Sequence, residues 1–348
     1  MLFKLIPSRL SLGLRPVMGM AIDLGTQNTL VHVRGQGVVL NEPSVIAVER
    51  ATGRLEAIGM GAKRMLGKTP ETIRVDRPVR NGVISDIDLA ELMLRSFIVQ
   101  VAEKRFFRLR PRLVVGVPSG ITEIEKRAIR QSASAAGARE VWLLPEPMAA
   151  AIGCGLPVSE PQGSMVLDIG GGTSEIAVIA LNGIVCDSSI RIAGDEIDQQ
   201  IIVNVKRHHN VQIGEPTAER VKFELGSAMP REQEAEMEVT GRDIVSGTPK
   251  RFILTSSEVR EWIQDPVRQI CEAVMECLED TPPELSSDIF DHGIVMTGGG
   301  ALIQGLGDLI TQQTGVKVIV DDEPLNCVAR GAAAVRDDFK RYKPVLMA

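Results

Sequence analysis

The sequence predicts an α/β fold built from two related halves, because the chain repeats one pattern of strands and turns. Residues 165–178 form an apolar run that ends at Asp168, then three glycines with a Thr-Ser pair, then a second apolar run. Residues 19–33 have the same order around Asp23, and in each copy a further glycine turn leads to a third apolar run. Apolar runs bounded by glycine turns are typical of strands. Two copies of such a β-meander indicate duplicated subdomains that face one another.

The stretches around and between the meanders alternate between strand and helix patterns. Thr122 with Glu125, and Thr255 with Glu258, form capping boxes that predict the start of a helix. Residues 41–78 and 229–250 are polar or mixed, and we expect a small insertion at each. The further elements expected are strands at 113–117, 141–144, 293–297 and 316–320, and helices at 86–101, 122–136, 148–153, 194–209, 217–225, 255–278 and 328–335.

Composition limits the classes of protein to which the chain can belong. Its 348 residues suggest about two domains, and 44% hydrophobic with 24% charged residues is ordinary for a soluble globular protein. Aromatic residues make up 3% and the net charge is −6, so no nucleic-acid partner is expected. The five cysteines are scattered without a CxxC pair, which indicates neither a zinc site nor a disulfide framework and fits a reducing cytoplasm. No apolar run approaches the length of a membrane span.

Two basic segments carry apolar side chains that could touch a membrane surface. On a helical projection of the N-terminus, Leu2, Phe3 and Ile6 fall on one arc, with basic residues opposite. This predicts a basic amphipathic segment on a membrane, with a leader of no role as an equal alternative. Phe106 and Phe107 lie within a strongly basic stretch. We favour a loop that binds anionic lipid over a helix end with both phenylalanines in the core.

The candidate site combines the two meanders with two further features. Glycines 170–172 allow a tight turn whose backbone N–H groups can converge on phosphate, and Asp23 and Asp168 could hold a hydrated Mg²⁺ beside it. Glycines 298–300 form a third turn between a strand and a helix, which is either an anion contact or a tight crossover. Glu146 begins a helix after a strand, where it could position water or simply complement the helix dipole.

Several familiar kinds of site are not indicated. The sequence contains neither the P-loop motif nor GxGxxG, so the common mononucleotide and dinucleotide signatures are absent. The four histidines lack metal-ligand spacing, and no catalytic triad has a usable context. A site between the two halves, built from strand tips and glycine turns, therefore remains the best candidate.

Six motifs occur in the order found in the actin/Hsp70/sugar-kinase superfamily: DLGTQNT, NEPSVIAV, EPMAAAIG, DIGGGTSE, TAERVK and TGGGALI. Together they resemble the MreB family of bacterial actin homologues over residues 20–335. The resemblance implies an actin-like (ribonuclease H-like duplicated) fold with two lobes and four subdomains around a nucleotide cleft. The implied division is a leader at 1–19, subdomain IA at 20–45, 81–158 and 330–348, IB at 46–80, IIA at 159–194 and 257–329, and IIB at 195–256.

The same resemblance implies a function. Members of the family are expected to bind ATP and Mg²⁺ and to form filaments with copies of themselves on the inner face of the bacterial cytoplasmic membrane. These filaments work with membrane proteins of the cell-wall elongation machinery to maintain rod shape, and a weak ATPase governs their turnover. The alternative is another ATPase of the superfamily, either a specialised paralogue or a small-molecule kinase.

The motifs also imply a role for each site residue. Asp23 and Asp168 would hold Mg²⁺ through water, and Glu146 would activate the attacking water with help from Thr173. The implied nucleotide contacts are Thr26, Gln27 and Asn28 in the first phosphate loop, Gly171, Gly172 and Thr173 in the second, and Glu219, Arg220, Val221, Lys222, Gly298, Gly299, Gly300 and Ala301 on the adenosine side. Phe106 and Phe107 match the membrane-inserting loop of the family. Gln27, Pro145 and Ser174 depart from the usual pattern, and we expect nucleotide binding to survive these changes.

Overall fold

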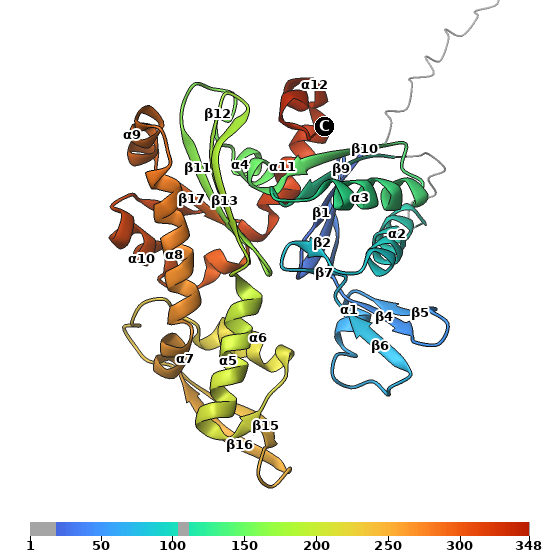
Figure 1. Cartoon of the computed structure of the whole chain (residues 1–348), viewed down its shortest axis with the longest axis vertical. Coiled ribbons are helices and arrows are strands. Elements are labelled where there is room, and N and C mark those ends of the chain that lie inside the picture. The colour runs from blue at the N-terminus through green and yellow to red at the C-terminus, as the bar shows by residue number, and fades with distance from the viewer. Residues whose placement is uncertain (1–18, 104–110, 348) are drawn as a thin grey trace, which may run out of the picture.

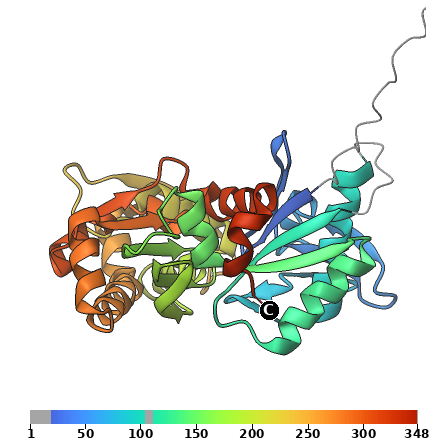
Figure 2. The ribbon, with the colours of Figure 1, turned by 90° about the horizontal axis from the view of Figure 1, so that it is seen from above.

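The computed structural model describes residues 19–103 and 111–347, which form two lobes side by side (Figure 1). Each lobe contains a five-stranded sheet and, at its lower end in this view, a smaller sheet. Seen from above, helix α11 (Cys327–Asp337) lies between the lobes (Figure 2). Leu2, Phe3, Ile6, Phe106 and Phe107, on which the membrane predictions rest, lie outside the described residues.

The large sheet of the first lobe begins with the predicted meander. Its strands run in the order β10-β9-β1-β2-β3, with β1, β2 and β3 antiparallel and with β9 and β10 parallel on the other side of β1. The strands are β1 (Gly19–Leu24), β2 (Asn28–Val33), β3 (Gly37–Pro43), β9 (Arg112–Val117) and β10 (Glu140–Pro145), and the sheet packs against α2 (Ile87–Glu103) and α3 (Glu123–Ala135).

The large sheet of the second lobe has the same topology, so the predicted duplication is confirmed. Its order is β13-β12-β11-β17-β18, again a meander followed by two strands parallel to its first strand. Its central strands β11 and β12 are buried along their whole length, which explains why most of their residues are apolar. The strands are β11 (Ser164–Ile169), β12 (Ser174–Ala180), β13 (Gly183–Ile190), β17 (Ile294–Thr297) and β18 (Val318–Val320).

Helices α11 and α4 (Glu146–Gly153) cross between the lobes almost backbone to backbone. A Cβ atom on Gly153 would lie 1.9 Å from the carbonyl oxygen of Cys327, and one on Gly331 would lie 1.8 Å from that of Ala149. Only glycine fits at such an approach. Both helices contribute to a buried cluster that also takes side chains from both large sheets. This small-residue junction therefore fixes how the two halves meet.

The two stretches expected to be insertions form small sheets separate from the large ones. In the first lobe the order is β5-β4-β6, and in the second it is β14-β15-β16. The elements are β4 (Ile46–Glu49), β5 (Leu55–Ile58), α1 (Met60–Lys63), β6 (Ile73–Asp76) and the hairpin β7 (Val79–Arg80) with β8 (Val83–Ile84), and then α5 (Gly194–His209), β14 (Val211–Gln212), α6 (Glu215–Leu225), β15 (Glu236–Asp243) and β16 (Pro249–Thr255).

The predicted long helix at 255–278 is wrong, because it is two helices that break at Ile263. Its Thr255–Glu258 capping box is confirmed, as is the Thr122–Glu125 box of α3. The break follows from Pro266, whose ring would clash with the carbonyl of the residue four positions earlier in a continuous helix. The two helices are α7 (Ser256–Trp262) and α8 (Gln264–Glu279).

The remaining elements complete the second lobe and the C-terminus. They are α9 (Pro283–His292), the 3₁₀ turn η1 (Gly299–Leu302), α10 (Leu306–Thr314), η2 (Pro324–Asn326), α12 (Phe339–Tyr342) and η3 (Lys343–Val345). Within the described residues, every helix is too short or too polar to cross a bilayer.

Candidate functional site

A cavity of about 480 Å³ lies between the two lobes and is lined by residues of both. The hairpin turns after β1 and β11 face it, together with the turn after β17 and the side of α6. The predicted residues that line it are Asp23, Thr26, Gln27, Asn28, Glu146, Asp168, Gly171, Gly172, Thr173, Glu219, Lys222, Gly298, Gly299 and Gly300. The fold therefore brings residues that are far apart in the sequence into one site.

Three carboxylic acids, Asp23, Glu146 and Asp168, gather in the cavity. Burial raises the pKa of Asp23 to about 7 and that of Asp168 to about 8, with the charges of Asp23 and Glu175 adding to the second shift. Burial and the charges of the other acids raise the pKa of Glu146 well above its usual range. Among the described residues, no Lys or Arg side chain makes an ion pair with Asp23, Glu146 or Asp168. Such a group of acids fits a divalent cation, which would supply the missing positive charge.

The glycines of the second hairpin are required because the two hairpins meet. A Cβ on Gly171 would lie 2.3 Å from Cγ of Gln27, and one on Gly172 would lie 2.7 Å from Oγ1 of Thr26. Both turns thus approach one another more closely than any side chain would allow. Both turns line the same cavity, and the backbone N–H groups of such glycine-rich turns can cradle an anion.

The third glycine turn packs against the end of β11 as well as lining the cavity. Gly298 has a φ of 81°, and a Cβ there would lie 2.5 Å from a carboxylate oxygen of Asp168. A Cβ on Gly300 would lie 2.1 Å from the side chain of Ile169. Ala301 is buried behind this turn and does not line the cavity. The turn therefore serves both as a tight crossover and as a wall of the site.

Helix α6 (Glu215–Leu225) presents part of the TAERVK motif to the cavity. Glu219 and Lys222 line the cavity, while Arg220 is exposed and Val221 is buried in the core of the second lobe. Because a helix turns by about 100° for each residue, four consecutive residues cannot all face one side. The motif thus divides between the cavity, the solvent and the core.

The positions that depart from the family pattern have defined surroundings. Ser174 is buried and donates to the carbonyl oxygen of Ile192 at 2.6 Å, so its hydroxyl stabilises the second lobe. Pro145 ends β10 and precedes the first turn of α4, which carries Glu146. Neither Ser174 nor Pro145 lines the cavity.

Gln27, the third departure, links the two lobes across the cleft. Its amide nitrogen donates to Asp195 at the start of α5, and its amide oxygen accepts from Arg77 at 2.7 Å. Beside this link, Nζ of Lys63 in α1 is 2.7 Å from a carboxylate oxygen of Glu219 in α6. The sequence predicts none of these three contacts, because the partners are more than 100 residues apart in two of the three pairs and their spacing carries no local signal.

Further residues of the site were also missed. Glu175 is a buried acid within the apolar strand β12, and it accepts a hydrogen bond from Ser189 at 2.6 Å. An acid inside an otherwise apolar run was the available signal. Phe223, Leu302 and Leu325 are exposed and line the cavity, so they give it an apolar rim. Phe223 stands between charged residues of α6, which is an unusual place for a large apolar side chain.

Two sheets of identical topology with a cavity between their hairpin turns define an actin-like protein. The chain belongs to the MreB/Mbl family, because the model described as "MreB/Mbl protein" matches residues 17–344. It is 54% identical to the cell shape-determining protein MreB of Escherichia coli strain K12, over 90% of this chain and 91% of the relative. It is 44% identical to the cell shape-determining protein Mbl of Bacillus subtilis strain 168, over 92% and 96%.

A solved structure agrees with this placement. The structure of MreB5 of Spiroplasma citri bound to ADP superposes with a TM-score of 0.89 at 37% identity, and the match covers 94% of this chain and 98% of that one. The predicted actin-like fold is confirmed. The chain is therefore a bacterial actin homologue of the cell shape-determining class, as the motifs predicted.

Proposed function

We propose that this protein binds ATP with Mg²⁺ in the cleft and polymerises with copies of itself into filaments at the inner face of the cytoplasmic membrane. There the filaments organise the membrane proteins of cell-wall elongation and so maintain rod shape. The observation that carries the proposal is the cavity in which two aspartate-tipped hairpins of the same topology meet. The binding of ADP by the Spiroplasma citri relative supports it.

Asp23 and Asp168 are the proposed holders of Mg²⁺ through water. Their raised pKa values mean that both acids resist ionisation when no cation is near, so a cation and the acids would stabilise each other. When bound, the ion would neutralise phosphate charge and act as a Lewis acid. The acids themselves would orient its water shell from the two facing strand tips.

The residues around the phosphates have distinct proposed roles. Thr26, Gln27 and Asn28 would contact one side of the phosphate chain, and the backbone N–H groups of Gly171 and Gly172 the other. On the adenosine side the proposed contacts are Glu219, Lys222, Gly298, Gly299 and Gly300, while Ala301, Arg220 and Val221 do not line the cavity and would hold the turn and helix α6 in place.

Glu146 is the proposed base for hydrolysis of ATP to ADP and phosphate. It lies in the cavity in the first turn of α4, and its pKa is raised by burial and by the neighbouring acids. A carboxylate with a raised pKa is a better acceptor for the proton of an attacking water. Thr173, on the opposite hairpin, would help to hold that water in line with the terminal phosphate. The resulting ATPase would be weak and would time filament turnover.

The proposed membrane contacts adjoin neighbouring strand ends. Gly19, the first residue of β1, pairs with Arg112, the first residue of β9. The basic leader and the loop with Phe106 and Phe107 immediately precede these two residues in the sequence. Both segments therefore join the first lobe at the N-terminal ends of the neighbouring strands β1 and β9, which suits simultaneous contact with an anionic membrane surface.

We also propose the division into four subdomains with the boundaries given above. The small sheet β5-β4-β6 falls within 46–80, and β14-β15-β16 falls within 195–256. Lys63 and Glu219 then connect IB with IIB across the mouth of the cleft. Closure of these two subdomains on ATP would couple nucleotide binding to the shape of the filament subunit.

Assembly is tested by pelleting and electron microscopy of the full chain with Mg²⁺ and either ATP, ADP or no nucleotide. We expect filaments that depend on ATP and form on vesicles containing anionic lipid. A Glu146→Gln variant should bind ATP and assemble but release phosphate at least about a hundredfold more slowly. A protein that stays monomeric at high concentration with ATP and lipid would refute the proposal.

The membrane contact is tested by co-sedimentation with anionic vesicles. The double variant Phe106→Ser/Phe107→Ser should lose most of its vesicle binding, because it removes two large apolar side chains from the proposed loop. Phe290→Ser is the matched control, since Phe290 is an exposed phenylalanine of α9 in the other lobe. Equal vesicle binding by both variants would remove the loop from the proposal.

A further inference from the structure

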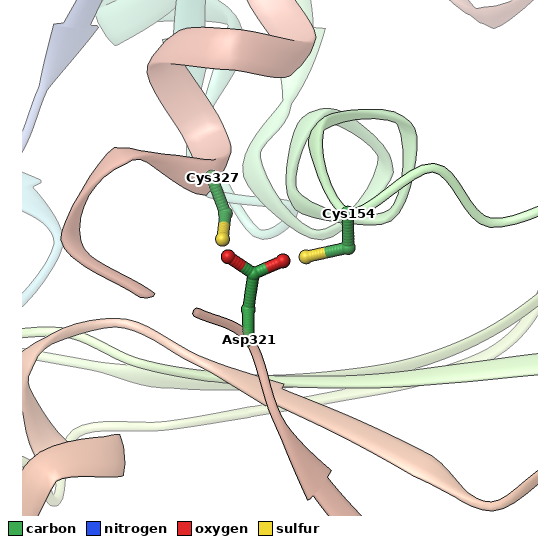
Figure 3. A group of neighbouring side chains, drawn as sticks. All are labelled: Cys154, Asp321 and Cys327. Atoms are coloured by element: carbon green, nitrogen blue, oxygen red, sulfur yellow. The ribbon is translucent and has the colours of Figure 1, made fainter. Parts of the chain in front are cut away.

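Two cysteines and an aspartate that are distant in sequence meet at the junction of the lobes. Cys154 caps the C-terminal end of α4, Asp321 follows β18, and Cys327 is the first residue of α11. One ligand atom from each lies within 4.8 Å of those of the other two. Figure 3 shows both sulfur atoms pointing toward the Asp321 carboxylate, which lies between them. The three side chains thus converge on a single point from three separate elements.

The backbone around this group, which we call the Cys–Asp cluster, is held firmly. The N–H of Asp321 donates to the carbonyl oxygen of Met296 at 3.1 Å, and its carboxylate accepts from the N–H of Glu323 at 2.9 Å. Cys327 lies where α4 and α11 cross backbone to backbone at Gly153. Ligands on rigid elements keep their geometry when a cation arrives, which favours binding.

Arg330 supplies a balancing charge beside the cluster. Its Nη2 lies 2.8 Å from each carboxylate oxygen of Asp321 and 3.5 Å from Sγ of Cys327, and its Nε donates to the carbonyl oxygen of Gly153. Two thiolates and one carboxylate carry three negative charges. A divalent cation and the guanidinium together carry three positive charges, so the occupied cluster would be neutral. Hydrogen bonds from such an outer group orient the ligands of a metal site.

We propose that Cys154, Asp321 and Cys327 form a binding site for a thiolate-preferring divalent cation, with Zn²⁺ as the best match. Sulfur ligands with one carboxylate suit Zn²⁺ rather than Mg²⁺, which prefers oxygen ligands and water. A water molecule would complete the tetrahedron, and both thiols would release their protons to solvent on binding. The site is distinct from the acids of the cleft and does not depend on the proposed ATP binding.

The position of the site gives the ion a mechanical consequence. It would fasten α4, which carries Glu146, to α11 and to the segment after β18. Pro324, Leu325 and Val328 of that segment and helix line the cleft cavity. An ion at the cluster would therefore make the junction between the two lobes more rigid. The other close thiol pair, Cys186 and Cys277 at 3.5 Å, has no third ligand in such a group among the described residues.

The test is a titration of the reduced, tag-free full chain with Co²⁺, followed by displacement with Zn²⁺. Co²⁺ bound to thiolates gives a charge-transfer absorption in the near ultraviolet that oxygen ligands do not give. We expect one Co²⁺ per chain, and a loss of affinity of at least about tenfold in Cys154→Ser and in Cys327→Ser. Cys271→Ser and Cys186→Ser, which change cysteines outside the cluster, should bind as the parent does.

A second measurement on the unmodified chain covers the case in which a serine variant does not fold. Thiol alkylation with and without Zn²⁺, mapped to peptides by mass spectrometry, should show protection of Cys154 and Cys327 but not of Cys186. Absence of a charge-transfer band from the parent, the same band in both cluster variants, or unprotected Cys154 and Cys327 would each overturn the proposal.

Discussion

The buried acid Asp168 makes a quantitative prediction about stability without nucleotide or metal. Burial and two neighbouring acids raise its pKa from the ordinary 3.8 to about 8 in the folded chain. Between pH 3.8 and about pH 8, the folded state therefore keeps a proton on Asp168 that the unfolded state has lost. Its contribution to the free energy of unfolding is fully present below pH 3.8 and is lost as the pH rises through the folded-state pKa of about 8.

The size of the effect follows from proton linkage. One proton retained only by the folded state lowers the free energy of unfolding by about 1.4 kcal/mol for each pH unit. From about pH 5 to about pH 7, Asp168 alone should remove about 2.7 kcal/mol from the stability of the cation-free protein. Asp168→Asn replaces the acid with an amide that does not titrate. The stability of the variant should therefore fall less steeply with pH than that of the parent. The difference between the two slopes should be about 1.4 kcal/mol for each pH unit.

The assay is urea unfolding in chelator across this pH range, without nucleotide. The control is Asp291→Asn, which changes an exposed aspartate of α9 and should keep the slope of the parent. Mg²⁺ with ATP should flatten the pH dependence of the parent more than that of Asp168→Asn, in which only Asp23 and Glu146 of the three cleft acids still titrate. Equal slopes for the two variants without cation would refute the account of the acidic group in the cleft.

Five further substitutions test the junction, the cleft and, for comparison, the helix α1. Gly331→Ala should lower the free energy of unfolding by about 1–3 kcal/mol, because its Cβ would meet a backbone carbonyl of α4. In the helix α1, Gly61→Ala should instead raise it by about 0.5–1 kcal/mol. Lys63→Met and Glu219→Gln break one half-buried pair, and both should speed release of a fluorescent ATP analogue, with a coupling of about 1 kcal/mol in a double-mutant cycle. If the effects of Lys63→Met and Glu219→Gln on the release rate were additive, the interaction between the two side chains would be contradicted. Gln27→Ala should also speed release of the ATP analogue. An unchanged release rate would show that the contact of Gln27 with Asp195 does not help to retain the nucleotide.

Local features of this chain were readable from the sequence because their causes lie within a few residues. The aspartate-tipped hairpins, both capping boxes and the repeat of the meander depend on turn chemistry, on capping by neighbouring side chains and on apolar periodicity. The break of the long helix at Ile263 was also a local effect, since Pro266 could have predicted it. The family motifs also pointed to turns that line the cavity between the lobes.

The sequence by itself determined the strands, the turns and the acids that stand at the strand tips. Tertiary structure alone decided which of these meet. Gln27 contacts Asp195, Lys63 contacts Glu219, and Cys154 lies beside Asp321 because the two lobes pack against each other. Spacing along the chain carries no record of such contacts, since they depend on how α4 and α11 cross at their glycines. The same crossing that fixes the cleft thus also creates the Cys–Asp cluster, which no sequence motif had indicated.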